Sequence, residues 1–325
     1  MPAETLPKAD ARLLRTIGGR HASRNENLLS FRAVGDGHGA HVRAREGAER
    51  GVGVPASDRA GVWGGAPRLG QMRVTFLGTG TSSGVPVVGC DCATCRSEDP
   101  RDRRWRPSIY LELSDRTRVL VDTSPDLRSQ ALAFGVAGVD VILFTHHHAD
   151  HVMGLDDVRA FNYRQRGSIP CLGDASTLAA LRRMFAYAWD RSLPKAGGVP
   201  RLRLLEVTGR FCLGRSEVVP VPVYHGTHPI LGYRVDAFAY LTDCSAIPAA
   251  SWPLLEGVEV LVLDALRHRP HPTHFSLSEA VEVAARIGAR QTYFTHMCHD
   301  LPHAETCAAL PAGVTLAHDG LVVDV

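Results

Sequence analysis

The sequence has little net charge, no apolar run of membrane-spanning length and no apolar signal segment near its N-terminus. Its 36 Lys and Arg residues nearly balance 34 Asp and Glu residues, which leaves a formal net charge of +2. This balance argues against binding of nucleic acids or membranes through a strong overall field, although local patches are not excluded. Without a signal segment or an apolar span, we expect a protein of the reducing cytoplasm.

Cysteine is scarce and unevenly distributed. Of the eight cysteines, three lie close together as Cys90, Cys92 and Cys95. In a chain without a secretory signal, this clustering indicates metal binding rather than disulfide bonds. The alternative is that the three are reduced structural thiols. Three thiolates are one ligand short of a tetrahedral zinc shell, so we expect a fourth ligand from elsewhere in the chain.

The first 71 residues differ in composition from the rest. They are rich in Ala, Gly and Arg and, apart from residues 11–15, have no sustained helical or strand period. Such a composition favours a disordered tail, to which we assign no function. Core-like sequence begins abruptly at Met72, so we expect one folded domain over residues 72–325.

From Arg73 onward, short apolar strands alternate with helical patterns. We expect a hairpin of residues 109–113 and 118–122, a mostly antiparallel run of strands at 201–207, 217–224 and 233–240, buried strands at 139–144, 258–263 and 292–295, and helices at 176–188 and 276–287. Runs of strands closed by helices predict an α/β fold in which two packed sheets carry helices on the outside.

The most informative stretch is Thr145–His151, which follows the apolar run 139–144. On an extended strand end, the side chains of His146 and His148 leave the same side of the backbone. Asp150 and His151 follow where the chain turns. Such nitrogen and oxygen ligands suit Zn²⁺, Mn²⁺ or Fe²⁺. The alternatives are an expression tag, which would lie at a terminus, or ordinary surface histidines.

Three later residues of metal-binding type also follow buried strands: His225, Asp243 and His296. With the first cluster they make seven ligands, which is what two adjacent metals with one shared carboxylate require. We predict that one metal binds His146, His148 and His225, that the other binds Asp150, His151 and His296, and that Asp243 bridges them. Asp122 also ends a strand, and either orients a ligand histidine or caps the helix after Pro125.

The His-His-His-Ala-Asp-His run and the three later ligands resemble the metallo-β-lactamase superfamily. Within it, the chain is most similar to the phosphoribosyl 1,2-cyclic phosphate phosphodiesterases, and the similarity covers about residues 72–325. The motifs are Phe76–Gly80, Gly89–Cys95, Leu231–Tyr233, Tyr240–Asp243 and Thr295–His299. The resemblance implies an αβ/βα sandwich of two mixed sheets with a dinuclear site at one edge. Asp243 and the Asp150-His151 pair separate the chain from the antibiotic-hydrolysing branch, whose second site normally uses a cysteine.

The resemblance also implies roles for residues outside the seven ligands. A histidine at the position of His299 completes the structural zinc of Cys90, Cys92 and Cys95, with Cys298 as the alternative fourth ligand. His274 matches a histidine that contacts the scissile phosphate, and is our candidate for protonating the leaving group. The alternative is that His274 is a helix-capping loop residue, and His268 and His271 lie close in sequence.

We therefore expect a dinuclear Mn²⁺- or Zn²⁺-dependent phosphodiesterase, with Asp150 and His274 as catalytic residues and one further structural Zn²⁺. A metal-bound hydroxide would attack a small cyclic phosphodiester. One alternative is a tRNA 3′-processing endonuclease, although no long basic insertion is present. Another is a non-catalytic accessory protein of pyrroloquinoline quinone biosynthesis, which would not need all seven ligands. We expect a small phosphorylated substrate, with neither membrane nor nucleic acid as partner, and a homodimer is left open.

Overall fold

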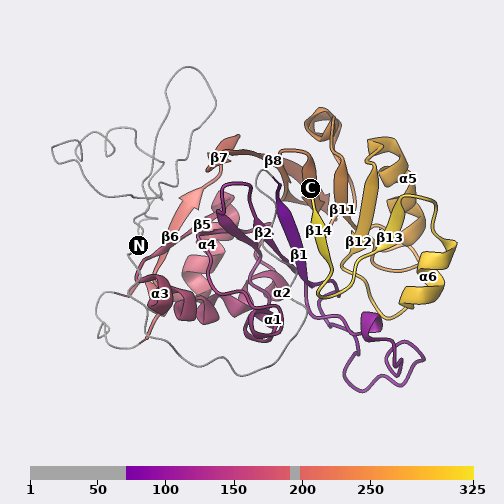
Figure 1. Ribbon diagram of the computed structural model, residues 1–325, viewed down its shortest axis with the longest axis horizontal. Helices are drawn as coiled ribbons and strands as arrows, with labels where there is room; N and C mark the ends of the chain where they lie inside the picture. Colours follow the sequence, from indigo (N-terminus) through magenta and orange to yellow (C-terminus); the bar gives the residue numbers. More distant parts are fainter. Residues whose placement is uncertain (1–70, 191–197) are drawn as a thin grey trace.

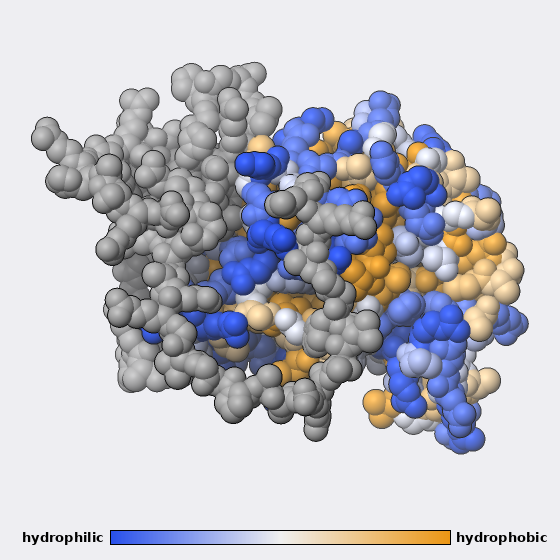
Figure 2. Space-filling view, in the orientation of Figure 1, coloured by the Kyte–Doolittle hydropathy of each residue, from blue (hydrophilic) through white to orange (hydrophobic). Residues whose placement is uncertain are grey.

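The computed structural model describes residues 71–190 and 198–325 (Figure 1). The predicted disordered tail lies outside the described residues except for Gln71, so its disorder and the boundary at Met72 stay predictions. Among the described residues, no helix combines the length and the hydropathy that a bilayer span requires. On the face shown in Figure 2, hydrophilic side chains are interspersed with apolar ones over the described surface.

Two seven-stranded sheets form the centre of the fold. The first has the order β14-β1-β2-β3-β4-β5-β6 and the second β13-β12-β11-β10-β9-β8-β7. The first comprises β1 (Arg73–Gly78), β2 (Ser108–Glu112), β3 (Arg118–Val121), β4 (Val141–Leu143), β5 (Ile169–Gly173), β6 (Leu202–Glu206) and β14 (Val322–Asp324). The second comprises β7 (Phe211–Leu213), β8 (Ser216–His225), β9 (His228–Val235), β10 (Phe238–Leu241), β11 (Val260–Asp264), β12 (Gln291–Thr295) and β13 (Val314–Leu316).

Helices cover the outer face of each sheet (Figure 1). Those of the first half are α1 (Leu127–Ala133), α2 (Ala149–Val152), α3 (Arg159–Gln165) and α4 (Ala175–Met184). The second half contributes α5 (Leu277–Ile287) and α6 (His303–Ala309). Short 3-10 turns are η2 (Pro100–Asp102), η3 (Met153–Val158), η4 (Ala186–Ala188) and η6 (Ala249–Leu255). This arrangement confirms the predicted sandwich of two mixed sheets with helices outside.

Strand alternation divides the apolar residues among three layers. In β11, Val260 and Val262 join the core between the sheets, whereas Leu261 and Leu263 pack toward the helices of the second half. A third cluster lies between the first sheet and its helices and includes Phe144 and Leu181. Because successive side chains of a strand point to opposite faces, a strand with a continuous apolar run, such as Val260–Leu263 of β11, is buried on both sides.

The predicted hairpin is confirmed, since β2 and β3 pair antiparallel with Ile109 opposite Val121. Helix α5 is confirmed too, and it begins with a capping box between Ser276 and Glu279. The predicted helix over 176–188 ends at Met184 and is followed by the turn η4. Strands β5, β7, β13 and β14 were not predicted.

Two strand predictions were wrong in detail. Residues 201–207 were expected to join an antiparallel run, but β6 pairs parallel with β5 and lies at the edge of the first sheet. Its neighbour β5 precedes it in the chain, with helix α4 in between, and the residue pattern of 201–207 alone does not reveal this pairing. Residues 233–240 were expected to form one strand, but the chain turns at Asp236 (φ 51°) and forms β9 and β10, which pair antiparallel.

The partly buried Asp319 carboxylate holds the loop that follows β1. It accepts hydrogen bonds from Thr79 N (2.9 Å), Thr79 Oγ1 (2.8 Å) and Trp105 N (2.6 Å). Burial raises the pKa of Asp319 to about 7 despite these donors. The carboxylate thus joins three segments that are distant in sequence and lie beside the strand ends.

We predict that Asp319→Ala lowers the free energy of unfolding by about 2–4 kcal/mol at pH 8, because it leaves buried N–H donors without an acceptor. Asp324→Ala is the control, since Asp324 is half exposed and pairs with Arg73 at the surface; it is expected to cost less than about 1 kcal/mol. Urea denaturation of both variants measures the difference. Equal, small losses in the free energy of unfolding of the two variants would show that the Asp319 carboxylate does not stabilise the fold through these hydrogen bonds.

Candidate dinuclear metal centre

All seven predicted metal ligands lie at one edge of the molecule, where strands of both sheets end. His146, His148, Asp150 and His151 follow β4, His225 ends β8, Asp243 follows β10 and His296 follows β12. The ligand atoms form two groups, each within 4.8 Å: His146, His148, His225 and Asp243, and Asp150, His151, Asp243 and His296. These are the two predicted sets, with Asp243 common to both. That each residue binds metal stays a prediction.

The distances within the second group match the edges of a metal tetrahedron. Asp243 Oδ1 lies 3.0 Å from His151 Nε2 and 3.2 Å from His296 Nε2. Asp150 Oδ2 lies 3.4 Å from each of these nitrogens. Ligands bound at about 2.0–2.1 Å in a tetrahedron are separated by roughly 3.3 Å. The other oxygen of Asp243, Oδ2, lies 3.7 Å from His146 Nε2, so the carboxylate faces both groups.

The state of the buried nitrogens also fits a metal site. Among the described residues, the buried Nε2 atoms of His146 and His151 find no hydrogen-bond partner. Buried polar atoms in native structures nearly always have a partner, and a coordinated cation would supply one here. The donor set of imidazoles and carboxylates suits divalent zinc or manganese.

The Nδ1 atoms of His151 and His225 are held by hydrogen bonds within the protein. His151 Nδ1 donates to Asp122 Oδ2 at 2.7 Å. His225 Nδ1 lies 3.0 Å from the carbonyl oxygen of Asp243 and 2.9 Å from that of Thr273, so it carries a proton. Such bonds set the tautomer and leave Nε2 free to face a metal. The rings are therefore oriented before any cation binds.

Asp122 proves to be an orienting residue, and the capping interpretation is wrong. It is fully buried and accepts from Thr145 N (2.9 Å) and Thr145 Oγ1 (2.8 Å) as well as from His151. The N-cap of α1 is instead Asp126. Because the Thr145 hydroxyl donates to Asp122, its oxygen is free to accept from His146 Nδ1, which lies 3.0 Å away. One carboxylate thus supports two of the histidines.

The electrostatics of the site favour cations. Burial alone would raise the pKa of Asp243, but His151 and His296 hold it well below its usual value. Burial alone would lower the pKa of His151, but Asp243, Asp150 and Asp122 outweigh burial and raise it well above its usual value. Three carboxylates around one imidazole form a strongly negative pocket, which divalent cations would neutralise.

Three site residues have left-handed backbone conformations that are uncommon outside glycine. The φ angles are 63° for Asp122, 54° for Asp243 and 60° for His296. Each comes within two residues of a strand end, where the chain turns sharply over the sheet edge. Strain of this kind concentrates at functional sites, and here it accompanies the turn that brings the side chains toward one another.

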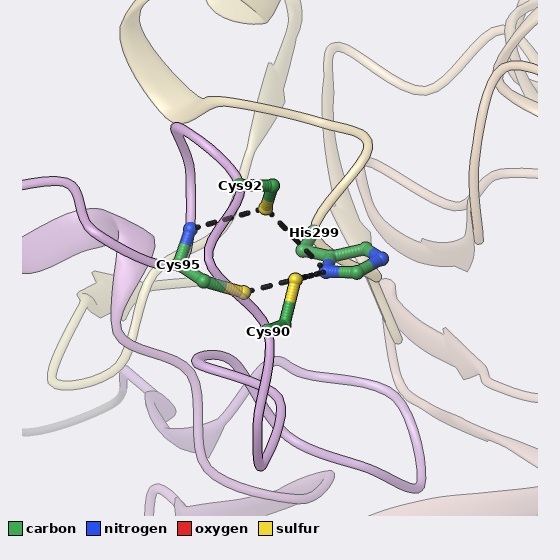
Figure 3. A group of neighbouring side chains, drawn as sticks. All are labelled: Cys90, Cys92, Cys95 and His299. Carbon is green, nitrogen blue, oxygen red and sulfur yellow. Dashed lines mark hydrogen bonds between the residues drawn. The ribbon is translucent and has the colours of Figure 1, made fainter.

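The three clustered cysteines face His299 (Figure 3). The Sγ atoms of Cys90, Cys92 and Cys95 lie 3.3, 3.6 and 3.3 Å from His299 Nδ1. Zinc bonds of about 2.3 Å to sulfur and 2.0 Å to nitrogen give edges of roughly 3.5 Å. The alternative ligand, Cys298, lies outside this group, and its Sγ accepts from Asp300 N. The geometry therefore favours His299.

His274 lies within the site rather than at its margin. Its ring stacks on His296, with centroids 4.7 Å apart and planes 12° apart, and stands edge-on to His225 at 4.7 Å. The cap of α5 is Ser276, so the capping alternative for His274 is not observed. Its ring lies 5.2 Å from that of His271, whereas His268 is exposed.

Asp264 is a site residue that we did not predict. Its Oδ2 accepts a 2.7 Å hydrogen bond from His274 Nδ1. The signal was present in the sequence, because Asp264 follows the apolar run 260–263 as Asp243 follows its own strand.

Comparison with known proteins identifies the superfamily. The profile of the beta-lactamase superfamily domain matches residues 117–297, more than half of the chain. The chain belongs to the metallo-β-lactamase superfamily. It is a metal-dependent hydrolase, as predicted. A solved diphosphatase of the PhnP family is 46% identical, with a TM-score of 0.73, over 78% of this chain and 97% of that one. This similarity agrees with the predicted resemblance to phosphoribosyl cyclic phosphate phosphodiesterases.

Other relatives carry different names. An octanoyltransferase from Porphyromonas gingivalis is 37% identical over 77% of this chain, but the chain spans only 51% of that protein. A ribonuclease Z from Pyrobaculum calidifontis is 25% identical over 75% of this chain and 93% of its own. Zn²⁺-bound PqqB from Methylobacterium extorquens, at 19% identity and a TM-score of 0.66 over 78% of this chain and 100% of its own, shows the shared fold.

We predict that Cys92→Ser lowers the zinc content by about one ion per chain, since three ligands remain of four. The melting temperature is expected to fall before turnover is affected. Cys298→Ser is the matched control, and we expect it to retain its zinc. Metal analysis by mass spectrometry and thermal unfolding check both variants. Zinc loss from Cys298→Ser as well would refute the assignment of His299 as the fourth ligand, and full zinc content in Cys92→Ser would refute the site itself.

Proposed function

We propose that the chain is a dinuclear metal-dependent phosphodiesterase that hydrolyses a small cyclic phosphodiester of the phosphoribosyl 1,2-cyclic phosphate type. The observation that carries the proposal is the Asp243 carboxylate, whose two oxygens face two separate groups of imidazole ligands. The PhnP-family diphosphatase, at 46% identity, supports chemistry at a phosphoester. The octanoyltransferase name describes a protein about twice as long as the matched segment.

In the proposed assignment, His146, His148 and His225 hold one Mn²⁺ or Zn²⁺, and Asp150, His151 and His296 hold the other. Cys90, Cys92, Cys95 and His299 hold a structural Zn²⁺. Two bound cations would make a water molecule acidic enough to attack at neutral pH, and would neutralise charge on the phosphoryl oxygens.

The side chains of the chain supply positioning and proton transfer. Asp150 is proposed to accept a hydrogen bond from the attacking water as well as to bind metal. As an imidazolium with a proton on each ring nitrogen, His274 is proposed to give the Nε2 proton to the leaving alkoxide as the P–O bond breaks, which leaves a neutral ring whose Nδ1 still donates to Asp264. Its Nδ1 is held by Asp264, which leaves Nε2 toward the imidazoles of His225 and His296. Proton donation of this type contributes about 10²–10⁴-fold to rate.

We predict that bis(p-nitrophenyl) phosphate is hydrolysed in Mn²⁺ or Zn²⁺ and that p-nitrophenyl phosphate and a precursor tRNA are not. A diphosphate diester such as ADP-ribose belongs in the same panel, because a relative is named a diphosphatase. Metal content is counted on the same sample, and about three metals per chain are expected. Ribose 1,2-cyclic phosphate 5-phosphate is then tested as the substrate itself.

Each other outcome contradicts the proposal in a distinct way. Cleavage of the precursor tRNA would favour the endonuclease, which the similarity to ribonuclease Z along most of that protein makes the second candidate. Turnover of the diphosphate diester alone would favour a diphosphatase. Bound metal without turnover of any phosphoester would favour the accessory protein of cofactor biosynthesis.

A further inference from the structure

The cysteine–histidine group of Cys90, Cys92, Cys95 and His299 is built from two segments that are far apart in the sequence (Figure 3). The three cysteines share one short loop, whereas His299 lies in the loop between β12 and α6. The sulfur atoms are therefore brought together by a single turn of the chain. The position of the imidazole depends instead on how the distant loop is held against that turn.

The backbone of Arg104 is paired with the segment that enters the cysteine loop. Arg104 N donates to Val85 O at 2.7 Å, and Val85 N donates to Arg104 O at 2.9 Å. Two residues further along, Val87 N donates to Cys95 Sγ at 3.3 Å. The main chain at Arg104 is thus fixed next to the cysteines.

The side chain of Arg104 holds the loop that carries His299. It is completely buried. Its Nη1 donates to the carbonyl oxygen of Cys298 at 2.9 Å, and its Nη2 donates to the carbonyl oxygen of Leu301. These two carbonyls flank His299 and Asp300. Because the guanidinium is a rigid planar fork, one side chain fixes both ends of the turn in which His299 lies.

Asp102 compensates the buried charge of Arg104. Its Oδ1 accepts from Arg104 Nη2 at 3.2 Å and from His303 N at 2.8 Å. A buried cation without a counter-charge would be strongly destabilising. His303 is the first residue of α6, so the ion pair also attaches the chain directly after the loop. The segment 298–303 is therefore held at three backbone positions.

We infer that Arg104 is a positioning residue for the structural zinc, which holds the loop 298–301 through its two carbonyls so that His299 faces the cysteines before any metal binds. The inference rests on the proposed zinc assignment. A ligand that is already in place does not have to be ordered when the metal binds, and this raises the affinity. In this arrangement the cysteine loop supplies three ligands and Arg104 fixes the position of the fourth.

The test measures metal affinity at the thiolate site rather than activity. The protein is titrated with Co²⁺ and followed by the thiolate-to-cobalt absorption, which reports only on a site with sulfur ligands. In Arg104→Met, an unbranched apolar side chain replaces the fork. We expect the Kd for Co²⁺ to rise about 10–100-fold, as it does when an outer support of a metal ligand is removed.

Two further variants separate bridging from charge and from stability. Arg104→Lys keeps a cation beside Asp102 but lacks the fork, so we expect a loss of affinity in this variant too. Asn162→Ala is the matched control, because Asn162 Nδ2 also joins two carbonyls, those of Gly167 at 2.9 Å and Arg201 at 3.0 Å. We expect Asn162→Ala to lower the melting temperature and to keep the Co²⁺ affinity of the wild type.

Wild-type affinity in Arg104→Met or Arg104→Lys overturns the inference, as does an equal loss of affinity in Asn162→Ala. If neither Arg104 variant folds, hydrogen exchange of the wild type decides, after zinc is removed with a chelator and Mn²⁺ is added back. The amides of Cys298 and His303, which donate to Leu266 O and Asp102 Oδ1, are expected to stay protected. Rapid exchange at both amides contradicts the inference.

Failure of the inference is distinguishable from failure of the proposed activity. A wild type without the thiolate-to-cobalt absorption refutes the zinc assignment and the role of Arg104 together. A wild type that binds Co²⁺ at the thiolates but hydrolyses no diester refutes the proposed activity alone, since the affinities of the Arg104 variants still decide the inference.

Discussion

The arrangement of the site depends on one buried carboxylate, Asp243, which two groups of histidines share. Its oxygens lie 3.0 Å from His151 Nε2 and 3.7 Å from His146 Nε2, in different groups. An ionised carboxylate surrounded by imidazoles in the protein interior is stable only when its charge is compensated. Divalent cations would provide that compensation, and the rest of the edge is built to place ligands around them.

The two sheets place these ligands through the same construction. Each sheet contains parallel strands whose carboxyl ends reach the same edge. In each, a buried aspartate at a strand end accepts a hydrogen bond from the Nδ1 atom of a site histidine. In the first sheet, Asp122 follows β3 and holds His151. In the second, Asp264 ends β11 and holds His274. The Cys90–Cys95 loop faces His299, three residues after His296, so a zinc ion there would brace the segment that carries a catalytic ligand.

Much of the metal site could be predicted from the sequence, because His146 and Asp243 each come two residues after an apolar run, 139–144 and 238–241. Pairing between distant segments was not readable. The parallel position of β6 depends on β5, and the contact of Asp264 with His274 depends on the path of the loop before α5. His299 and Cys298 are adjacent in sequence, so only the conformation of their loop separates them. The left-handed backbone of Asp122, Asp243 and His296 has no local sequence signal, since these are not glycines.

The most direct test of a shared carboxylate is a count of metals and of turnover in Asp243→Ala. The account predicts a folded variant that retains its structural zinc, loses one or both catalytic metals from a total of about three per chain, and no longer hydrolyses the diester. Circular dichroism and metal analysis on the same sample establish that the fold persists. A variant with three metals and full turnover would contradict the dinuclear site.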